Sequence, residues 1–329
     1  MSTDMLKPAS TRPGAAGALA SPLRHTGVWK IYAATAGLYG ISGIMQPQFF
    51  SADHLIQLLV ISSFLGILAM GQTLVILTGG IDLSVAYMLN LGAVIMTQAA
   101  SNYGGGTAAI IMAAAGIAIG ALNGLGVAYL KISPIIMTLA MSSILKSVTY
   151  VYTDGNPKGA APDWLRYLGT GSVFGIKLAL LVWLVLAAAV VLLLGKTTFG
   201  RKMYAIGTNP TVSHLSGIHN KRILVLVYTL SGLFAVLAGM MSVGFYGLSF
   251  LGMGDTLLLP SIAAVVIGGT SIMGGRGGYA GPIAGAVILY ILMSILTLLD
   301  MRDAGKQIIY GLVILVVLFL YGRAKTARS

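Results

Sequence analysis

Residues 176–222 read IKLALLVWLVLAAAVVLLLGKTTFGRKMYAIGTNPTVSHLSGIHNKR, an apolar run that ends abruptly in a basic, polar segment. The apolar part has about the ~20 residues that a helix needs to cross a hydrocarbon core, where every backbone polar group must be satisfied within the helix. The part from Lys196 to Arg222 contains no comparable run. We interpret the apolar run as a membrane-spanning helix and the basic segment as a loop outside the bilayer.

This loop also contains the signals of one short helix. Asn209 is a good capping residue, Pro210 suits a first helical position, and Gly217 suits the residue after a last turn. The sequence therefore predicts a helix over Asn209–Gly217, on the surface of a membrane protein that docks a soluble partner.

The composition supports a polytopic membrane protein. Of the 329 residues, 57% are hydrophobic and 9% are charged, whereas soluble domains carry about 25% charge. The acidic residues are all Asp, and there is no Cys. We therefore expect no enzymatic role, no cofactor and no metal. The net charge of +12 marks a cytoplasmic membrane face rather than a nucleic-acid partner.

Apolar runs of spanning length recur along the chain and predict an all-α bundle of about ten transmembrane helices. They lie near 28–46, 55–77, 83–100, 107–130, 134–152, 176–195, 223–243, 257–273, 280–299 and 306–322. We expect residues 28–322 to form one transmembrane domain, residues 323–329 a cytoplasmic tail, and residues 1–27 a disordered cytoplasmic tail. A mitochondrial presequence is the competing interpretation of 1–27, but Pro8, Pro13 and Pro22 interrupt an amphipathic helix.

Ten spans place both termini on one side, and the basic residues indicate which side. With a cytoplasmic N-terminus, fourteen Lys and Arg residues fall on the cytoplasmic side and five on the other. This asymmetry follows the positive-inside rule.

Two glycine-rich turns interrupt the apolar pattern, and each has two interpretations. In the first, a turn with a lone Asp either caps the next helix or forms part of a gate; its residues are Thr78, Gly79, Gly80, Asp82 and Ser84. In the second, six glycines in twelve residues permit a re-entrant turn or a hinge; its residues include Gly268, Gly269, Thr270, Gly274, Gly275 and Arg276.

Polar and small residues inside the spans are also ambiguous. Candidates for the translocation path are Gln72, Asn90, Gln98 and Asn123; the alternative interpretation is that each bridges neighbouring helices. Lys146 lies about two turns from the end of its span, so it can extend to the interface or bind a ligand. The glycine repeats at 116, 120 and 124 and at 281 and 285 indicate close helix packing, with a dimerisation face as the alternative.

Three segments carry a resemblance to the permease subunits of bacterial ABC importers for ribose, xylose and related monosaccharides. Residues 71–84 (GQTLVILTGGIDLS) and 264–277 (AVVIGGTSIMGGRG) are similar to the two most distinctive segments of that family. Residues 199–209 (FGRKMYAIGTN), followed by LSGI at 215–218, resemble the loop that engages the ATPase. The resemblance covers most of residues 50–322.

The resemblance implies a bacterial inner-membrane permease that works as a homodimer or heterodimer. An ABC ATPase subunit would bind inside, and a periplasmic or extracellular solute-binding protein outside. It implies ATPase-coupling roles for Gly200, Arg201, Asn209, Pro210, His214, Leu215 and Gly217. Where the family tends to have paired alanines and a charge, this chain has Val212, Ser213 and His214, which implies a dedicated ATPase.

Other functions remain open at this point. A related permease for nucleosides or branched-chain amino acids would share the same motifs. An ion-coupled secondary carrier would normally have buried acidic residues, and Asp82 is the candidate near a span. The outer loop 153–175, with Asp154, Lys158, Asp163, Trp164 and Arg166, is expected to contact the binding protein or to be a solvated cap.

Overall fold

The computed structural model describes residues 28–326; the predicted N-terminal tail and the last three residues of the C-terminal one lie outside this range. The helices, with two 3₁₀ turns, are α1 (Val28–Met45), η2 (Pro47–Phe50), α2 (Ala52–Leu77), α3 (Val85–Tyr103), α4 (Gly105–Ala128), α5 (Pro134–Thr153), α6 (Asp163–Thr170), α7 (Leu178–Lys196), α8 (Thr198–Thr208), α9 (Pro210–Leu215), α10 (Asn220–Tyr246), η3 (Asp255–Leu257), α11 (Leu258–Ile267), α12 (Ala280–Leu298) and α13 (Asp303–Thr326). Strands β1 (Ser172–Val173) and β2 (Ile176–Lys177) form a small antiparallel hairpin.

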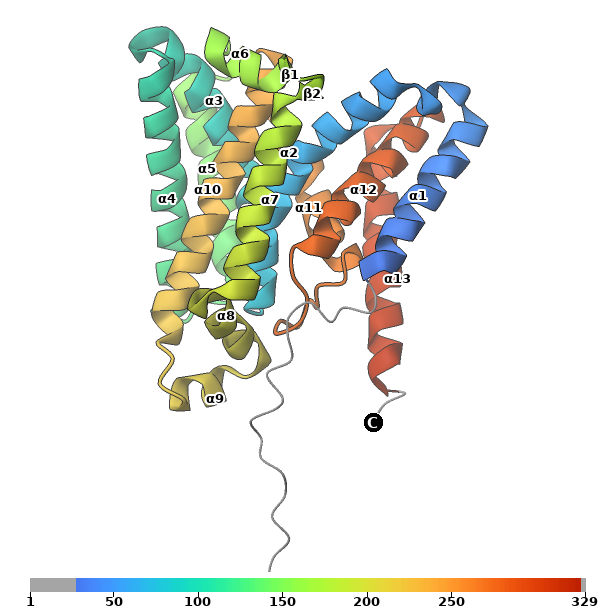
Figure 1. Cartoon of the computed structure of the whole chain (residues 1–329). Helices are drawn as coiled ribbons and strands as arrows, with labels where there is room; N and C mark the ends of the chain where they lie inside the picture. The colour runs from blue at the N-terminus through green and yellow to red at the C-terminus, as the bar shows by residue number, and fades with distance from the viewer. Residues whose placement is uncertain (1–27, 327–329) are drawn as a thin grey trace, which may run out of the picture.

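The helices form two groups that share α2. On one side, α10 packs against α3 and α4, and on the other α12 packs against α1 and α11. Helix α2 contacts both groups and is buried along most of its length, so it forms the centre of the bundle (Figure 1). The predicted all-α membrane bundle is confirmed.

The predicted number of crossings is not confirmed. Within the described range, six helices are long and apolar enough to cross a membrane: α2, α4, α5, α7, α10 and α12. In the predicted span 257–273, α11 has 10 residues and is about 15 Å long. It therefore reaches only about halfway through a hydrocarbon core of ~30 Å.

The glycine repeats are surfaces of close helix packing, which was the first of the two interpretations. A side chain at Gly120 would collide with the carbonyl of Tyr228 in α10, and one at Gly285 with that of Ala264 in α11. Because α10 and α11 cover these faces, neither is free to form a dimer interface.

Two connecting segments are more structured than expected, and one helix is longer. The loop 196–222 contains two helices, α8 and α9, where one was predicted. The outer segment 153–175 contains α6 and the first strand of the hairpin. Helix α13 continues to Thr326, past the start of the predicted tail at 323.

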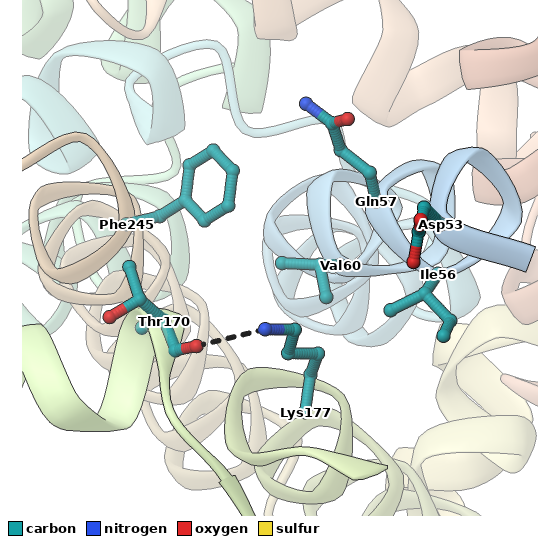
Figure 2. Close-up of a pocket in the computed structure, with 8 residues that line it drawn as sticks. Asp53, Ile56, Gln57, Val60, Thr170, Lys177 and Phe245 are labelled. Atoms are coloured by element: carbon teal, nitrogen blue, oxygen red, sulfur yellow. Dashed lines mark hydrogen bonds between the residues drawn. The ribbon is translucent and has the colours of Figure 1, made fainter. Parts of the chain in front are cut away.

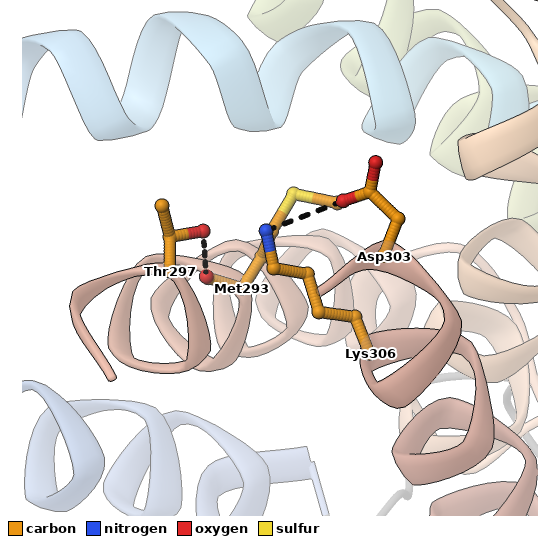
Figure 3. A network of polar contacts seen from close by, with 4 residues as sticks. All are labelled: Met293, Thr297, Asp303 and Lys306. Carbon is orange, nitrogen blue, oxygen red and sulfur yellow. Dashed lines mark hydrogen bonds and ion pairs between the residues drawn. The ribbon is translucent and has the colours of Figure 1, made fainter. Parts of the chain in front are cut away.

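The first turn of α13 contains an ion pair. Lys306 Nζ lies 3.4 Å from Asp303 Oδ1, and Thr297 Oγ1 donates to the Met293 carbonyl at 2.8 Å (Figure 3). A pair three residues apart on a helix contributes about 0.2–0.5 kcal/mol.

Candidate functional site

The first glycine turn is organised by a fully buried carboxylate. Asp82 Oδ1 accepts hydrogen bonds from the Ser84 N–H at 3.0 Å and the Ser84 hydroxyl at 2.6 Å. Its Oδ2 accepts from Ser231 Oγ of α10 at 2.9 Å. Ser84 is the residue before α3, so Asp82 closes the turn that leads into this helix and joins it to α10. Sequence reasoning missed Ser231, which is 149 residues away.

The same turn is bonded to three further helices. Gln72 of α2 donates to the Asp82 carbonyl at 3.1 Å, and Asn123 of α4 donates to Ser84 Oγ at 2.8 Å. Thr138 Oγ1 of α5 accepts from the Leu83 N–H at 3.0 Å. The amides of Gln72 and Asn123 thus join α2 and α4 to this turn, and their roles in the translocation path stay predictions.

The other two path candidates lie on α3. Gln98 donates to the Tyr152 carbonyl at 3.2 Å, and Asn90 is buried with its Oδ1 unpaired. Their roles in the path stay predictions.

The second glycine turn is held mainly by its backbone. The Ser271 N–H donates to the Arg276 carbonyl at 2.9 Å, and the Gly274 N–H donates to the Ser271 carbonyl at 2.9 Å. Gly274 has φ +82°, a conformation that only glycine adopts without strain. Gly268 and Gly269 end α11 at this turn, and Thr270 Oγ1 accepts from the Gly278 N–H at 3.2 Å. Arg276 is exposed.

The two turns and α8 meet at one place. The Gly275 N–H donates to the carbonyl of Leu77, the last residue of α2, at 2.9 Å. The last carbonyls of a helix have no partner within the helix, so the second turn completes α2. A side chain at Gly207 of α8 would collide with this same carbonyl and lie 2.5 Å from the Gly275 nitrogen. We call this cluster the glycine junction: Leu77, Gly79, Gly207, Gly274 and Gly275.

A side-chain hydrogen bond reinforces the junction. Tyr204 of α8 donates through its hydroxyl to the Gly277 carbonyl at 2.8 Å. Burial raises the pKa of Tyr204, which keeps the hydroxyl protonated and able to donate. Sequence reasoning missed α8, although Phe199, Met203 and Ile206 recur at helical spacing.

Helix α9 begins and ends as the sequence predicted. The Asn209 side chain accepts from the N–H groups of Thr211 at 3.0 Å and Val212 at 3.1 Å, and Pro210 is the first helical residue. Gly217, with φ +82°, follows the helix. The cap holds α9 in a fixed orientation after α8.

The coupling candidates divide into exposed and buried residues. Arg201, His214 and Leu215 are exposed, with Leu215 at 81%. Gly200 is buried, and a side chain there would collide with the Leu194 carbonyl of α7. Gly200 therefore shapes the turn between α7 and α8, and its role in ATPase coupling stays a prediction. In the triplet Val212, Ser213 and His214, the buried Ser213 hydroxyl donates to Asn220 Oδ1 at 3.1 Å, and only Val212 and His214 are exposed.

Residues 54–318 match a protein family described as the permease component of a branched-chain amino acid transport system. The chain belongs to this permease family. It is 38% identical over 292 residues to the ribose import permease RbsC of Escherichia coli K12, covering 86% of this chain and 90% of the relative. It is 34% identical to the fructose import permease FrcC of Rhizobium meliloti, covering 83% and 79%. The autoinducer 2 import permease LsrC of Escherichia coli O9:H4 is 32% identical, with 88% and 85% covered. No solved structure matches the chain.

At the other end of the bundle, this permease has an open groove of about 370 Å³. Asp53, Ile56 and Gln57 of α2 line one wall, and Phe245 of α10 lies across from them (Figure 2). The Lys177 ammonium, which borders the groove, donates to the Thr170 carbonyl at 3.1 Å. The volume is in the range of small-molecule sites, about 300–1,000 Å³.

The outer segment of the permease is fixed by Arg166. Its Nη1 donates to the carbonyl of Phe245 at 2.8 Å, at the C-terminus of α10. A cation at this position interacts favourably with the helix dipole. Arg166 therefore holds α6 on α10, while Asp154, Lys158, Asp163 and Trp164 remain exposed.

Proposed function

We propose that this permease is the membrane-spanning subunit of an ABC importer that moves a monosaccharide or a related small polar solute. The glycine junction carries the proposal. There, α8, which lies outside the main bundle, contacts both glycine turns through backbone atoms. Such close contacts leave little room for α8 and the turns to move independently. The sugar class is supported by relatives that import ribose and fructose.

The ATPase subunit would bind to α8 and α9. Exposed Leu215 and Val212 on α9 are apolar anchors of the kind that a groove on a partner accepts. Arg201 and Lys202 on α8 are exposed and add positive charge to the same surface. ATP binding would move this surface, and the junction would pass the movement to α2 and α11. The bundle would then change between outward-facing and inward-facing states.

The full transporter would contain two copies of the permease, or one copy and a close relative. We place α8, α9 and both termini in the cytoplasm, as the distribution of Lys and Arg favours. One permease domain with about ten membrane crossings is also part of the proposal. On the opposite face, exposed Asp154, Lys158, Asp163 and Trp164 would contact the solute-binding protein.

The test is reconstitution of the permease with its ATPase and binding protein in vesicles. We expect ATP-dependent uptake of labelled D-ribose or D-fructose. Uptake of leucine or adenosine instead would favour the alternative substrates, and uptake driven by an ion gradient without the ATPase would favour a secondary carrier. Reversing both charges, Arg201→Glu with Lys202→Glu, should abolish ATP-dependent uptake without reducing membrane insertion. Lys30→Glu, a charge reversal on exposed α1, is the matched control.

A further inference from the structure

One face of α5 is polar although α5 is long and apolar enough to cross a membrane. Ser143, Lys146 and Ser147 are all exposed on it, and their spacing of three and four residues places them on the same side of the helix. A lipid-facing surface would not carry this pattern, because charged and polar groups inside a membrane normally face a bundle interior or water.

The charged residues of this region lie at mid-depth. Lys146 is twelve residues after Pro134, the first residue of α5, which places it ~18 Å along the helix. Asp255 precedes the short α11, whose other end, about 15 Å along the helix, leads into the second glycine turn. Both positions are thus about halfway through a core of ~30 Å.

Close backbone contact brings Asp255 to α3. A side chain at Gly254 would collide with the Ala86 carbonyl, so the turn that contains Asp255 packs against the start of α3, where Tyr87 lies. Asp255 and Lys146 both lie near the Tyr87 hydroxyl. The Lys146 ammonium lies 5.8 Å from the centre of the Tyr87 ring, toward the start of α3 rather than toward the outer interface.

We call Tyr87, Lys146 and Asp255 the α5 cluster, and their polar atoms are free to bind a ligand. Lys146 and Asp255 are exposed and Tyr87 is half-buried. Among the described residues, the close ion pair is Asp303–Lys306, so Lys146 and Asp255 do not neutralise each other directly. Lipid strongly disfavours a charged residue near the centre of a helix, which argues that water covers this face.

We propose that the α5 cluster borders the water-filled pathway of the transporter and binds the hydroxyl groups of the solute. An ammonium donates, a carboxylate accepts, and a phenol does both, so the cluster can pair with neighbouring hydroxyls of a sugar. The Tyr87 ring adds an apolar surface for the C–H groups of a sugar ring. This inference rests on the proposed function and names the solute contacts for it.

The first test measures water access and does not depend on transport. The chain has no cysteine, so Ser143→Cys carries a single thiol. In the assembled complex, a charged methanethiosulfonate reagent should modify it at least about tenfold faster than Ile117→Cys on the exposed apolar face of α4, because a thiol reacts as the thiolate that water supports. D-Ribose should slow the reaction. Equal, slow modification of both variants would show that lipid covers the α5 face and would overturn the proposal.

The second test separates solute binding from coupling. Lys146→Met and Asp255→Asn should each raise the D-ribose concentration at half-maximal uptake about tenfold, since each loses a hydrogen bond to a charged group. Tyr87→Phe should raise it about threefold. Maximal ATP hydrolysis should stay unchanged in all three, and Lys30→Met on exposed α1 should match the wild type.

Unchanged half-maximal concentrations in all three variants would overturn the binding role. A wild-type complex that imports no sugar would instead overturn the proposed function and the solute assignment with it. In that case the thiol rates still decide whether the face borders water.

Discussion

The two glycine-rich turns begin at the same end of the bundle, yet they are held by different kinds of contact. The first turn is held by side chains, with Asp82 accepting from Ser84 and Ser231. The second is held by backbone groups and by the absence of side chains, as in the bond from Gly275 to Leu77. The first should therefore be sensitive to the loss of a polar group, and the second to the addition of a carbon atom.

The largest expected effect tests the first turn. Asp82→Ala removes three hydrogen bonds to a buried carboxylate, and a bond to a charged group is worth about 1.5–3 kcal/mol. We expect the variant to lose about 3–5 kcal/mol of stability, measured as a lower unfolding temperature in detergent. Asp53→Ala, in the exposed first turn of α2, should cost less than about 1 kcal/mol. Similar losses in both variants would contradict a special role for Asp82.

The next effect tests the glycine junction through α8. Gly207→Ala adds a methyl group against the Leu77 carbonyl, so α8 must separate from the end of α2. We expect the amount of solute moved per ATP to fall about tenfold or more, in line with the 1–3 kcal/mol of an overpacked site. Gly106→Ala on α4 has open space around it and should leave this ratio unchanged. A normal ratio in Gly207→Ala would rule out transmission through the junction.

A matched pair separates backbone strain from packing. Gly79 and Gly274 have almost the same φ, +84° and +82°, so alanine costs about 1–2 kcal/mol of strain at either position. At Gly274 the added carbon also lies 2.9 Å from the Gly79 nitrogen, whereas at Gly79 the nearest atom is 3.9 Å away. We therefore expect Gly274→Ala to lose at least about 1 kcal/mol more stability and to transport less per ATP. Equal losses would mean that strain alone matters there.

The smallest effect tests the side-chain bond between α8 and the second turn. Tyr204→Phe removes the 2.8 Å bond to the Gly277 carbonyl and should cost about 0.5–1.5 kcal/mol. Hydrogen exchange at residues 198–208 should become faster while the rest of the bundle stays protected. Tyr167→Phe on α6, an exposed tyrosine, is the control for the substitution.

Local contacts could be predicted from the sequence because their partners are a few residues apart. The cap of Asn209 on Thr211 and Val212 is one example, and the end of α9 at Gly217 is another. The number of crossings was harder to predict, since apolar composition does not reveal that α11 stops after 10 residues. The role of Arg166 could not be predicted, because its partners are the carbonyls at the end of α10.

By itself, the sequence determined that this protein is a helical membrane bundle, where its helix breaks lie, and which permease motifs it contains. Those features depend on apolar length, glycine and capping residues, whose physical effects act over one or two helical turns. Only the tertiary structure decided that Ser231 binds Asp82, that Leu77, Gly207 and Gly275 meet, and that Lys146 lies beside Tyr87. These contacts join residues far apart in the chain, and which helix faces meet is fixed by the packing of the whole bundle.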